Sequence, residues 1–311
     1  YPFEKNPQAV NPPWGYVHTG NNQPDSVDGV LYPGYYYPKD RAGRIEQLLK
    51  EKSDWTPEAV SAMQLDDVSI TAPENAREMA RVIGPGILAD VLNKWEGAHR
   101  VDDAGPVVYY NLLSHIIWLG MSDELGKEAL EGLMGTSLLK EALPQLLKND
   151  TTRWWDDVRS EGKETRVGIF KQAAEMTLAK LNGRFGSDSS QWKWGKIHQL
   201  KHPHPLGSVE MLDGIFSVGP FSVPGGNEVI NNLMFNLDTT GVFPVKAGPA
   251  LRKVSDLSDL SQGWTVSPSG QSGVRSSAHY GDQAGVFATG KVRKMLMRYA
   301  EGTLLKLNPK Q

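Results

Sequence analysis

Hydrophobic residues recur with helical spacing through the middle of the chain. Beginning at Arg41, the apolar residues Ile45, Leu48 and Leu49 fall on one face of a helix. A second helix is expected at Thr56-Pro57-Glu58, which combines an N-cap residue, a first-turn proline and an early acidic residue. Further helices are predicted over residues 72–93, 107–119, 123–148 and 163–185. The predicted buried face of the last one consists of Val167, Phe170, Ala174, Leu178 and Leu181.

After Gly186 the pattern changes to the alternation that is typical of strands. Residues 192–200 predict a half-buried strand with Trp192, Trp194 and His198 on one face. Shorter strands are predicted at residues 214–223, 233–235, 251–256 and 264–267, whereas residues 290–305 fit a strand or a helix equally well. Helices followed by strands indicate an α+β fold rather than an alternating α/β fold.

The first forty residues show neither the helical spacing nor the strand alternation of apolar residues. They are rich in proline and glycine and contain three consecutive tyrosines at 35–37, so we expect an extended loop that the aromatic residues keep ordered. The chain therefore divides into a loop segment at residues 1–40, a helical lobe at 41–185 and a strand-rich segment at 186–311.

Composition excludes several classes of protein. A net charge of −3 over 311 residues gives no basic surface for nucleic acid. The most apolar stretch, residues 107–121, is interrupted by Asn111, Ser114 and His115, so no membrane span is predicted. The absence of cysteine excludes disulfides, thiolate zinc sites and a cysteine nucleophile within these residues. The chain opens without a methionine or an apolar leader, so we expect a processed or trimmed product.

The loop at residues 15–24 contains the clearest candidate for chemistry. Gly20 gives the backbone unusual freedom and Pro24 restricts it, so the adjacent Asn21 and Asn22 are held in place. A fixed asparagine offers an uncharged NH2 donor of the kind that stabilises the oxyanion of an acyl-transfer intermediate. These residues also favour plain turns, and from the ten residues alone a turn is the better interpretation.

Other motifs point to structure rather than chemistry. His202-Pro203-His204 places two imidazoles together but lacks a third ligand, so a metal site is the weaker interpretation. Ser272 lacks the spacing of a nucleophile elbow, and the glycines around Pro85 lack the preceding strand of a dinucleotide site. The paired aspartates at 66–67, 102–103 and 156–157 fit solvated loops and caps. No phosphate-binding loop or zinc motif is present.

A dozen short stretches, in order along almost the whole chain, resemble the penicillin amidase family of N-terminal-nucleophile hydrolases. They include PFEKNP at 2–7, NP at 11–12 before GY at 15–16 and NN at 21–22, KDR at 39–41, WWDD at 154–157, ETR at 164–166, WKWGKIH at 192–198, HPLG at 204–207, residues 231–236, AGPALR at 247–252, the aspartates at 256 and 259, GQSG at 270–273 and HYGDQ at 279–283. Any one of these motifs is weak, whereas the full set in register is specific.

This resemblance implies an α-ββ-α sandwich, to which the chain gives a helical lobe and antiparallel strands. It implies an amide-bond hydrolase that acts on a small N-acyl amide through an N-terminal serine, exposed by autoproteolytic processing of a zymogen. That nucleophile would lie upstream, because Tyr1 cannot serve as one and matches a position well inside the family's catalytic β chain. The implied partners are an α subunit and upstream β-chain residues, and the implied location is periplasmic or secreted.

The resemblance also assigns roles to individual residues. Asn21 matches the side-chain oxyanion donor, and Arg41 matches the arginine that orients the surroundings of the nucleophile. Without the family match, Arg41 would be interpreted as a solvent-facing arginine at a helix start. No cofactor is required, but the family's structural calcium site takes a carboxylate from the stretch between these residues. A short deletion leaves Asp28 as the candidate metal ligand and Asp25 as a weaker one.

Two alternatives remain open. A non-catalytic or degenerate binding module on the same fold would be favoured if the upstream residue were not Ser, Thr or Cys. A helical scaffold with a β cap, unrelated to the family, would be favoured if Asn21 lay far from any cleft. The acyl-group specificity is not determined by these residues.

Overall fold

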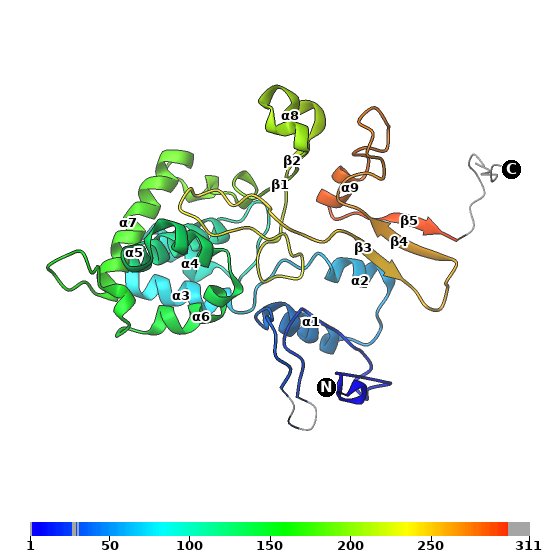
Figure 1. Ribbon diagram of the computed structural model, residues 1–311, viewed down its shortest axis with the longest axis horizontal. Coiled ribbons are helices and arrows are strands. Elements are labelled where there is room, and N and C mark those ends of the chain that lie inside the picture. Colours follow the sequence, from blue (N-terminus) through cyan, green and yellow to red (C-terminus); the bar gives the residue numbers. More distant parts are fainter. Residues whose placement is uncertain (1, 27–28, 30, 298–311) are drawn as a thin grey trace.

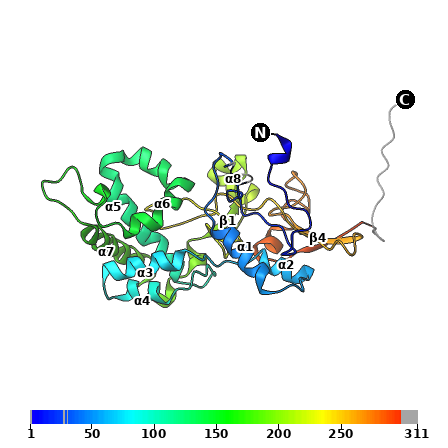
Figure 2. The same cartoon turned by 90° about the horizontal axis from the view of Figure 1, so that it is seen from below.

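The computed structural model describes residues 2–26, 29 and 31–297. Figure 1 shows α3 to α7 gathered at one end, the strands β3 to β5 at the other, and α1 between them. Figure 2 shows the same division from below. The helices are α1 (Asp40–Glu51), α2 (Pro57–Met63), α3 (Ala72–Ile83), α4 (Ile87–Lys94), α5 (Gly105–Met134), α6 (Ser137–Lys148), α7 (Arg166–Phe185), α8 (Glu210–Phe216) and α9 (Ala284–Ala288). None of the helices in the described residues is long and apolar enough to cross a bilayer.

The predicted helices exist, but glycines move their boundaries. The segment predicted at 72–93 is two helices, because Gly84 and Gly86 adopt positive φ angles of 83° and 154° between α3 and α4. The boundary predicted between 119 and 123 is wrong, since α5 runs on to Met134 with a kink at Gly126, where φ is 70°. The segment predicted at 123–148 therefore comprises the end of α5 and the whole of α6.

The predicted buried face of α7 is confirmed at Phe170 and Leu181, whereas its other positions are shifted by one residue. Val167 is exposed, whereas Arg166 is buried at the first position of the helix, after the Thr165 N-cap. The buried residues follow a helical period and are Arg166, Ile169, Phe170, Ala173, Thr177 and Leu181. Arg166 tolerates burial because its guanidinium pairs with Glu78 at 2.5 Å and with Asp150 at 3.0 Å.

The predicted strand at residues 192–200 is wrong for most of its length. Ser189–Gln191 and Trp194–Lys196 are 3-10 turns, and strand β1 begins only at Gln199. Trp194 stacks on His198 with ring centroids 4.7 Å apart, and the His198 N–H donates to the Trp194 carbonyl at 2.9 Å. The two side chains meet because the backbone turns, not because strand residues alternate.

A large aromatic and aliphatic core joins the helical lobe to these turns. Trp192 and Trp194 are fully buried in it together with residues of α3 to α7. A smaller second core lies under the strands and consists of Leu200, Val223, Leu233, Val266 and Phe287.

The strands form two small antiparallel sheets. One pairs β1 (Gln199–His202) with β2 (Val218–Ser222), and the other has the order β3 (Arg252–Ser255), β4 (Gln262–Val266), β5 (Arg293–Leu296). The prediction at 214–223 is wrong at its start, which belongs to α8, and the strand at 233–235 is reduced to one isolated bridge from Met234 to Ala247. The segment at 290–305 resolves into β5, and its residues from 298 onward lie outside the described part. Helices followed by antiparallel strands confirm the α+β class.

Candidate functional site

The loop that carries Asn21 is fixed against the start of α1. Gly20 packs so closely on this helix that an added Cβ would lie 2.7 Å from the backbone nitrogen of Ala42. Asn21 follows with a positive φ of 63°, a conformation that asparagine adopts more readily than most residues. Its carbonyl oxygen accepts a hydrogen bond of 2.9 Å from the Tyr37 N–H. The backbone on both sides of Asn21 is therefore held.

Arg41, in the first turn of α1, fixes the side chain of Asn21. Its Nη2 donates to the Gly20 carbonyl at 2.8 Å and to Oδ1 of Asn21. Its guanidinium also lies 5.5 Å from the ring centre of Tyr37. A guanidinium has no acceptor, so the amide oxygen must face Arg41 and the NH2 of Asn21 must face away. Within the described residues, that NH2 donates to no protein group.

Asn22 is used differently. Its Oδ1 accepts a hydrogen bond from the Gly20 N–H at 3.2 Å, and its Nδ2 donates to the Gln23 carbonyl at 3.2 Å. Both ends of this amide serve the turn. The two adjacent asparagines therefore have different roles: Asn22 stabilises the turn, and Asn21 offers its side-chain NH2 as a hydrogen-bond donor.

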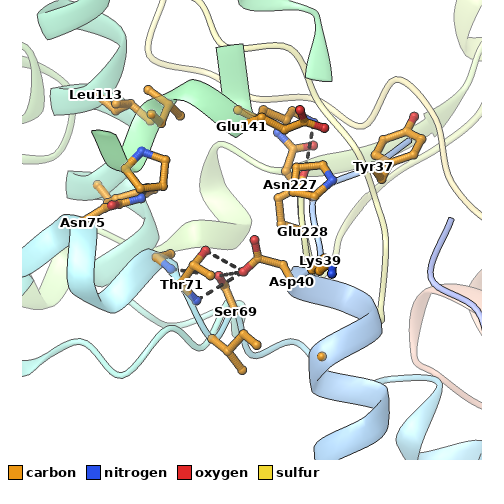
Figure 3. A pocket seen from close by; sticks show the side chains of 18 of the residues that line it. Tyr37, Lys39, Asp40, Ser69, Thr71, Asn75, Leu113, Glu141, Asn227 and Glu228 are labelled. Carbon is orange, nitrogen blue, oxygen red and sulfur yellow. Dashed lines mark hydrogen bonds and ion pairs between the residues drawn. The ribbon is translucent and has the colours of Figure 1, made fainter. Parts of the chain in front are cut away.

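A cavity of about 540 Å³ lies beside this loop, between α1, α3, α5 and α6. Figure 3 shows it closed on one side by the residue pair Asn227 and Glu228, which comes from a distant part of the chain. Its lining combines aromatic, acidic and amide side chains and includes Gln23, Tyr36, Tyr37, Asp40, Asn75, Tyr109, Leu113, Lys140, Glu141, Leu143, Asn227 and Glu228. A volume of this size is in the range of small-molecule sites.

Asp40 is the most buried charged group of the cavity. Its Oδ1 accepts hydrogen bonds from the Thr71 hydroxyl at 2.6 Å, from the Thr71 N–H at 3.2 Å and from the Ser69 hydroxyl at 3.3 Å. Burial raises the pKa of Asp40 above its ordinary value, the bonds from Thr71 and Ser69 oppose that rise, and the nearby Glu228 adds to it. The carboxylate is thus anchored by one oxygen to neutral donors (Figure 3).

Glu228 faces the same cavity from the loop after β2. Its Oε1 pairs with Lys140 of α6 at 2.9 Å, while its Oε2 is buried and has no hydrogen-bond partner among the described residues. The residue has a positive φ of 57°, which costs a non-glycine residue about 1–2 kcal/mol. The surrounding structure holds Glu228 in this conformation at the cavity wall.

A second cavity of about 590 Å³ adjoins the first, and Lys39 and Gly43 line both. Gln23 and Tyr37 line the first cavity, and Asn22 lines the second together with Trp14 and Tyr16. Asn21 itself is exposed and lines neither of the two. Asn21 therefore precedes one residue of each lining, Asn22 and Gln23, without lining either cavity itself.

The predicted metal ligand Asp28 lies outside the described residues. Asp25 is exposed and lines the second cavity. Among residues 2–26, 29 and 31–297, no group of three His, Cys, Asp or Glu side chains is placed to hold a metal ion. The described carboxylates by themselves do not form a calcium site, so no chemistry is assigned to a metal here.

The motifs interpreted as structural have structural contacts. The Nδ1 of His204 accepts from the Leu206 N–H at 3.1 Å, and its ring stacks on Phe216. The hydroxyl of Ser272 accepts from the Val274 N–H at 3.1 Å within a turn. Each of the three aspartate pairs gives one carboxylate to a basic side chain: Asp66 to Arg44, Asp102 to Lys193 and Asp157 to Arg159.

Comparison with known proteins identifies the family. The model of the family described as penicillin amidase matches residues 1–302. This chain belongs to the penicillin amidase family.

Individual relatives are distant members of the penicillin amidase family. The chain is 24% identical to the acyl-homoserine lactone acylase QuiP of Pseudomonas aeruginosa, with 92% of this chain and 38% of that protein covered. It is 25% identical to the penicillin acylase 2 proenzyme of Pseudomonas sp., with 91% of this chain and 36% of that protein covered. The chain thus spans little more than a third of these curated relatives.

A solved penicillin amidase structure shows the same fold. The thermostable penicillin G acylase from Alcaligenes faecalis superposes with a TM-score of 0.54 and 16% sequence identity. The match covers 97% of this chain and 59% of that chain. The helical lobe and the antiparallel strands described above therefore belong to an N-terminal-nucleophile hydrolase fold.

Sequence reasoning missed the acidic cavity. Asp40 stands directly before Arg41 in the stretch Lys39-Asp40-Arg41, but the family resemblance assigns a role only to the arginine. Glu228 gave no signal, because the residues that bring it opposite Asp40 are separated from it by most of the chain. Only the folded structure shows that the two carboxylates share one cavity.

Proposed function

We propose that this chain forms the later part of the catalytic β chain of an N-acyl amide hydrolase of the penicillin amidase kind. In this proposal a serine at the start of the β chain, upstream of these residues, attacks the amide carbonyl. Its own α-amino group accepts the proton, the amine departs, and water then releases the acid from the acyl-enzyme. The family match and the shared fold support the proposal.

Asn21 has a specific role in this reaction. Attack on the carbonyl places a negative charge on its oxygen, and a donor that is already oriented stabilises that charge without further rearrangement. The observation that carries the proposal is the contact between Arg41 and the amide oxygen of Asn21, which leaves the NH2 directed away from Arg41 and without an acceptor among the described residues. Arg41 acts as a positioning residue, since it touches the asparagine rather than the reacting atoms.

The proposal extends to partners and location. The names of the relatives, acyl-homoserine lactone acylase and penicillin acylase, favour a small N-acyl amide as the substrate. The partners would be an α subunit and the upstream β-chain residues of one self-processed precursor, in the periplasm or outside the cell. A structural calcium ion would use Asp28 together with carboxylates from those other segments.

Replacing Asn21 in the complete enzyme tests the proposal. Asn21→Ala should lower kcat about 10²–10³-fold, the loss that is typical of removing one oxyanion donor. KM should change much less, because the donor acts on charge that develops only in the transition state. Asn21→Asp should be at least as damaging, since one oxygen would pair with Arg41 and the other would repel the oxyanion.

Asn22→Ala is the matched control, because its amide makes only turn contacts. Rates would be measured with a chromogenic phenylacetyl or fatty-acyl anilide after active-site titration, alongside thermal melts. If Asn21→Ala melted earlier but kept its kcat per titrated site, Asn21 would be a turn residue and the oxyanion assignment would be wrong.

A further inference from the structure

The cavity beside the Asn21 loop contains more buried negative charge than buried positive charge. Asp40 is only 7% exposed, and the side chain of Glu228 is 16% exposed. Lys140 is the buried cation of the lining, and it is paired with Glu228. Lys39 and Glu141 are exposed at the rim and have opposite charges. Among the described lining residues, the interior therefore has one carboxylate without a cation.

That carboxylate is Asp40. The three donors that it binds are the hydroxyls of Ser69 and Thr71 and one backbone N–H, and all of them act on the same oxygen. Its Oδ2 has no hydrogen-bond partner among the residues that the structure describes. Figure 3 shows this carboxylate on the side of the cavity that faces Glu228. Oδ2 can therefore accept a hydrogen bond from a ligand, and a cation between the two acids would offset the cost of desolvating both carboxylates.

The rest of the lining suits an organic cation. Tyr36, Tyr37, Tyr109 and Tyr110 line the cavity, and aromatic faces attract ammonium and guanidinium groups. One such contact already exists at its edge, where Arg41 lies against Tyr37. The lining includes no third carboxylate placed to complete a metal site, since no metal-binding group occurs in the described chain.

We propose that this cavity binds an ammonium or guanidinium group of the substrate, between Asp40 and Glu228. The inference rests on the proposed function, because it places a second part of the amide substrate in the cavity that Gln23 and Tyr37 line, beside the Asn21 loop. The preferred substrate is then an N-acyl amide that carries a positive charge on its amine half or on its acyl half.

Binding is tested without catalysis. Butylguanidinium chloride and its neutral counterpart butylurea would be titrated by calorimetry into the purified complete enzyme. Butylguanidinium should bind at least about 10-fold more tightly than butylurea, and Asp40→Asn or Glu228→Gln should weaken it about 10- to 100-fold, as expected for a hydrogen bond to a charged group. Both variants keep the shape of the side chain, and Glu228→Gln covers the case in which Asp40→Asn fails to fold.

Glu58→Gln is the control, because Glu58 is an exposed carboxylate on α2 outside the cavity. Equal affinity for butylguanidinium and butylurea would overturn the proposal, as would unchanged affinity in both cavity variants.

Kinetics locate the charge on the substrate. For the amine half, kcat/KM would be compared between amides of 4-aminobutylguanidine and of 4-aminobutylurea that share one acyl group. For the acyl half, the 4-guanidinobutyryl anilide would be compared with the 4-ureidobutyryl anilide. A preference of about 10-fold or more for the cation in either pair supports the proposal, and its absence in both overturns it. If no amide were hydrolysed while butylguanidinium still bound as predicted, the failure would lie with the amide-hydrolase function and not with the cation site.

Discussion

Protonation of the buried His99 should destabilise the folded protein at mildly acidic pH. Its Nδ1 lies 2.8 Å from the Gly97 carbonyl oxygen and 3.0 Å from that of Asp67, and its Nε2 lies 2.8 Å from the Tyr110 hydroxyl. Carbonyl oxygens only accept, so Nδ1 carries the proton and Nε2 of the neutral ring accepts from Tyr110. A second proton would remove that acceptor and place a charge in the core. Burial lowers the pKa of His99 from 6.5 to about 4.

The direction and size of the effect follow from this pKa. Because the pKa is lower in the folded state than in the unfolded state, the unfolded chain takes up the proton first. The stabilisation is complete above pH 6.5 and is lost as the pH falls toward 4. Between pH 7.5 and 4.5 the lost free energy of unfolding amounts to about 2–3 kcal/mol for this one group. His99 is completely buried, so solvent screening does not reduce the figure.

Urea unfolding at a series of pH values measures this loss. Tryptophan fluorescence reports on the site, because the rings of Trp95 and Trp194 lie 5.3 and 6.0 Å from His99. His99→Gln does not titrate, so the variant should be less stable at pH 7.5 but lose about 2–3 kcal/mol less than the native protein on going to pH 4.5. The comparison cancels the other titrating groups. Parallel pH profiles for the two proteins would refute the reasoning.

Two further predictions concern packing. Gly20→Ala should lower both the melting temperature and the kcat of the complete enzyme, because its Cβ would press on the Ala42 backbone and displace the oxyanion asparagine. Gly132→Ala, where nothing lies within 4 Å, is the control, and equal behaviour of the two variants would contradict the argument. Arg166→Ala should cost about 1.5–3 kcal/mol in urea unfolding, the value of a hydrogen bond to a charged group, because Glu78 loses its buried partner but keeps its pair with the exposed Arg81 at 2.8 Å. Arg166→Met combined with Glu78→Leu should recover most of that loss, and a single-variant loss below about 1 kcal/mol would contradict the buried-pair interpretation.

Local sequence signals determined the helices well, because their causes act over a few residues. Thr56 and Thr165 each cap a helix by accepting a backbone N–H three residues on, at 3.2 Å in both cases. The glycines around Pro85 interrupt the helical segment that they punctuate in the sequence. Capping and chain reversal depend on neighbouring atoms, so they can be predicted without knowledge of the fold.

The aromatic stretch that follows the helices shows where a pattern misleads. Trp192, Trp194 and His198 are all fully buried, as a one-sided strand would require, yet none of them lies in a strand. Trp194 begins a 3-10 turn, Trp192 directly follows another, and His198 lies between the second turn and β1. The N–H groups of Trp194 and Gly195 donate to carbonyl oxygens of residues 103 and 101, so distant backbone groups replace strand partners. The spacing of apolar residues shows which side chains are buried, not which backbone conformation buries them. Turns packed on several sides can therefore bury every second residue as a strand does.

The candidate site could be predicted partly from the sequence and partly only from the tertiary structure. The sequence determined which residues are present, and the resemblance to the penicillin amidase family singled out Asn21 and Arg41. Only the tertiary structure decided that Arg41 contacts the amide oxygen, so that the NH2 of Asn21 faces away from Arg41. Only the tertiary structure placed Glu228 opposite Asp40, because contacts between distant segments depend on how the helices and loops pack and not on any local spacing.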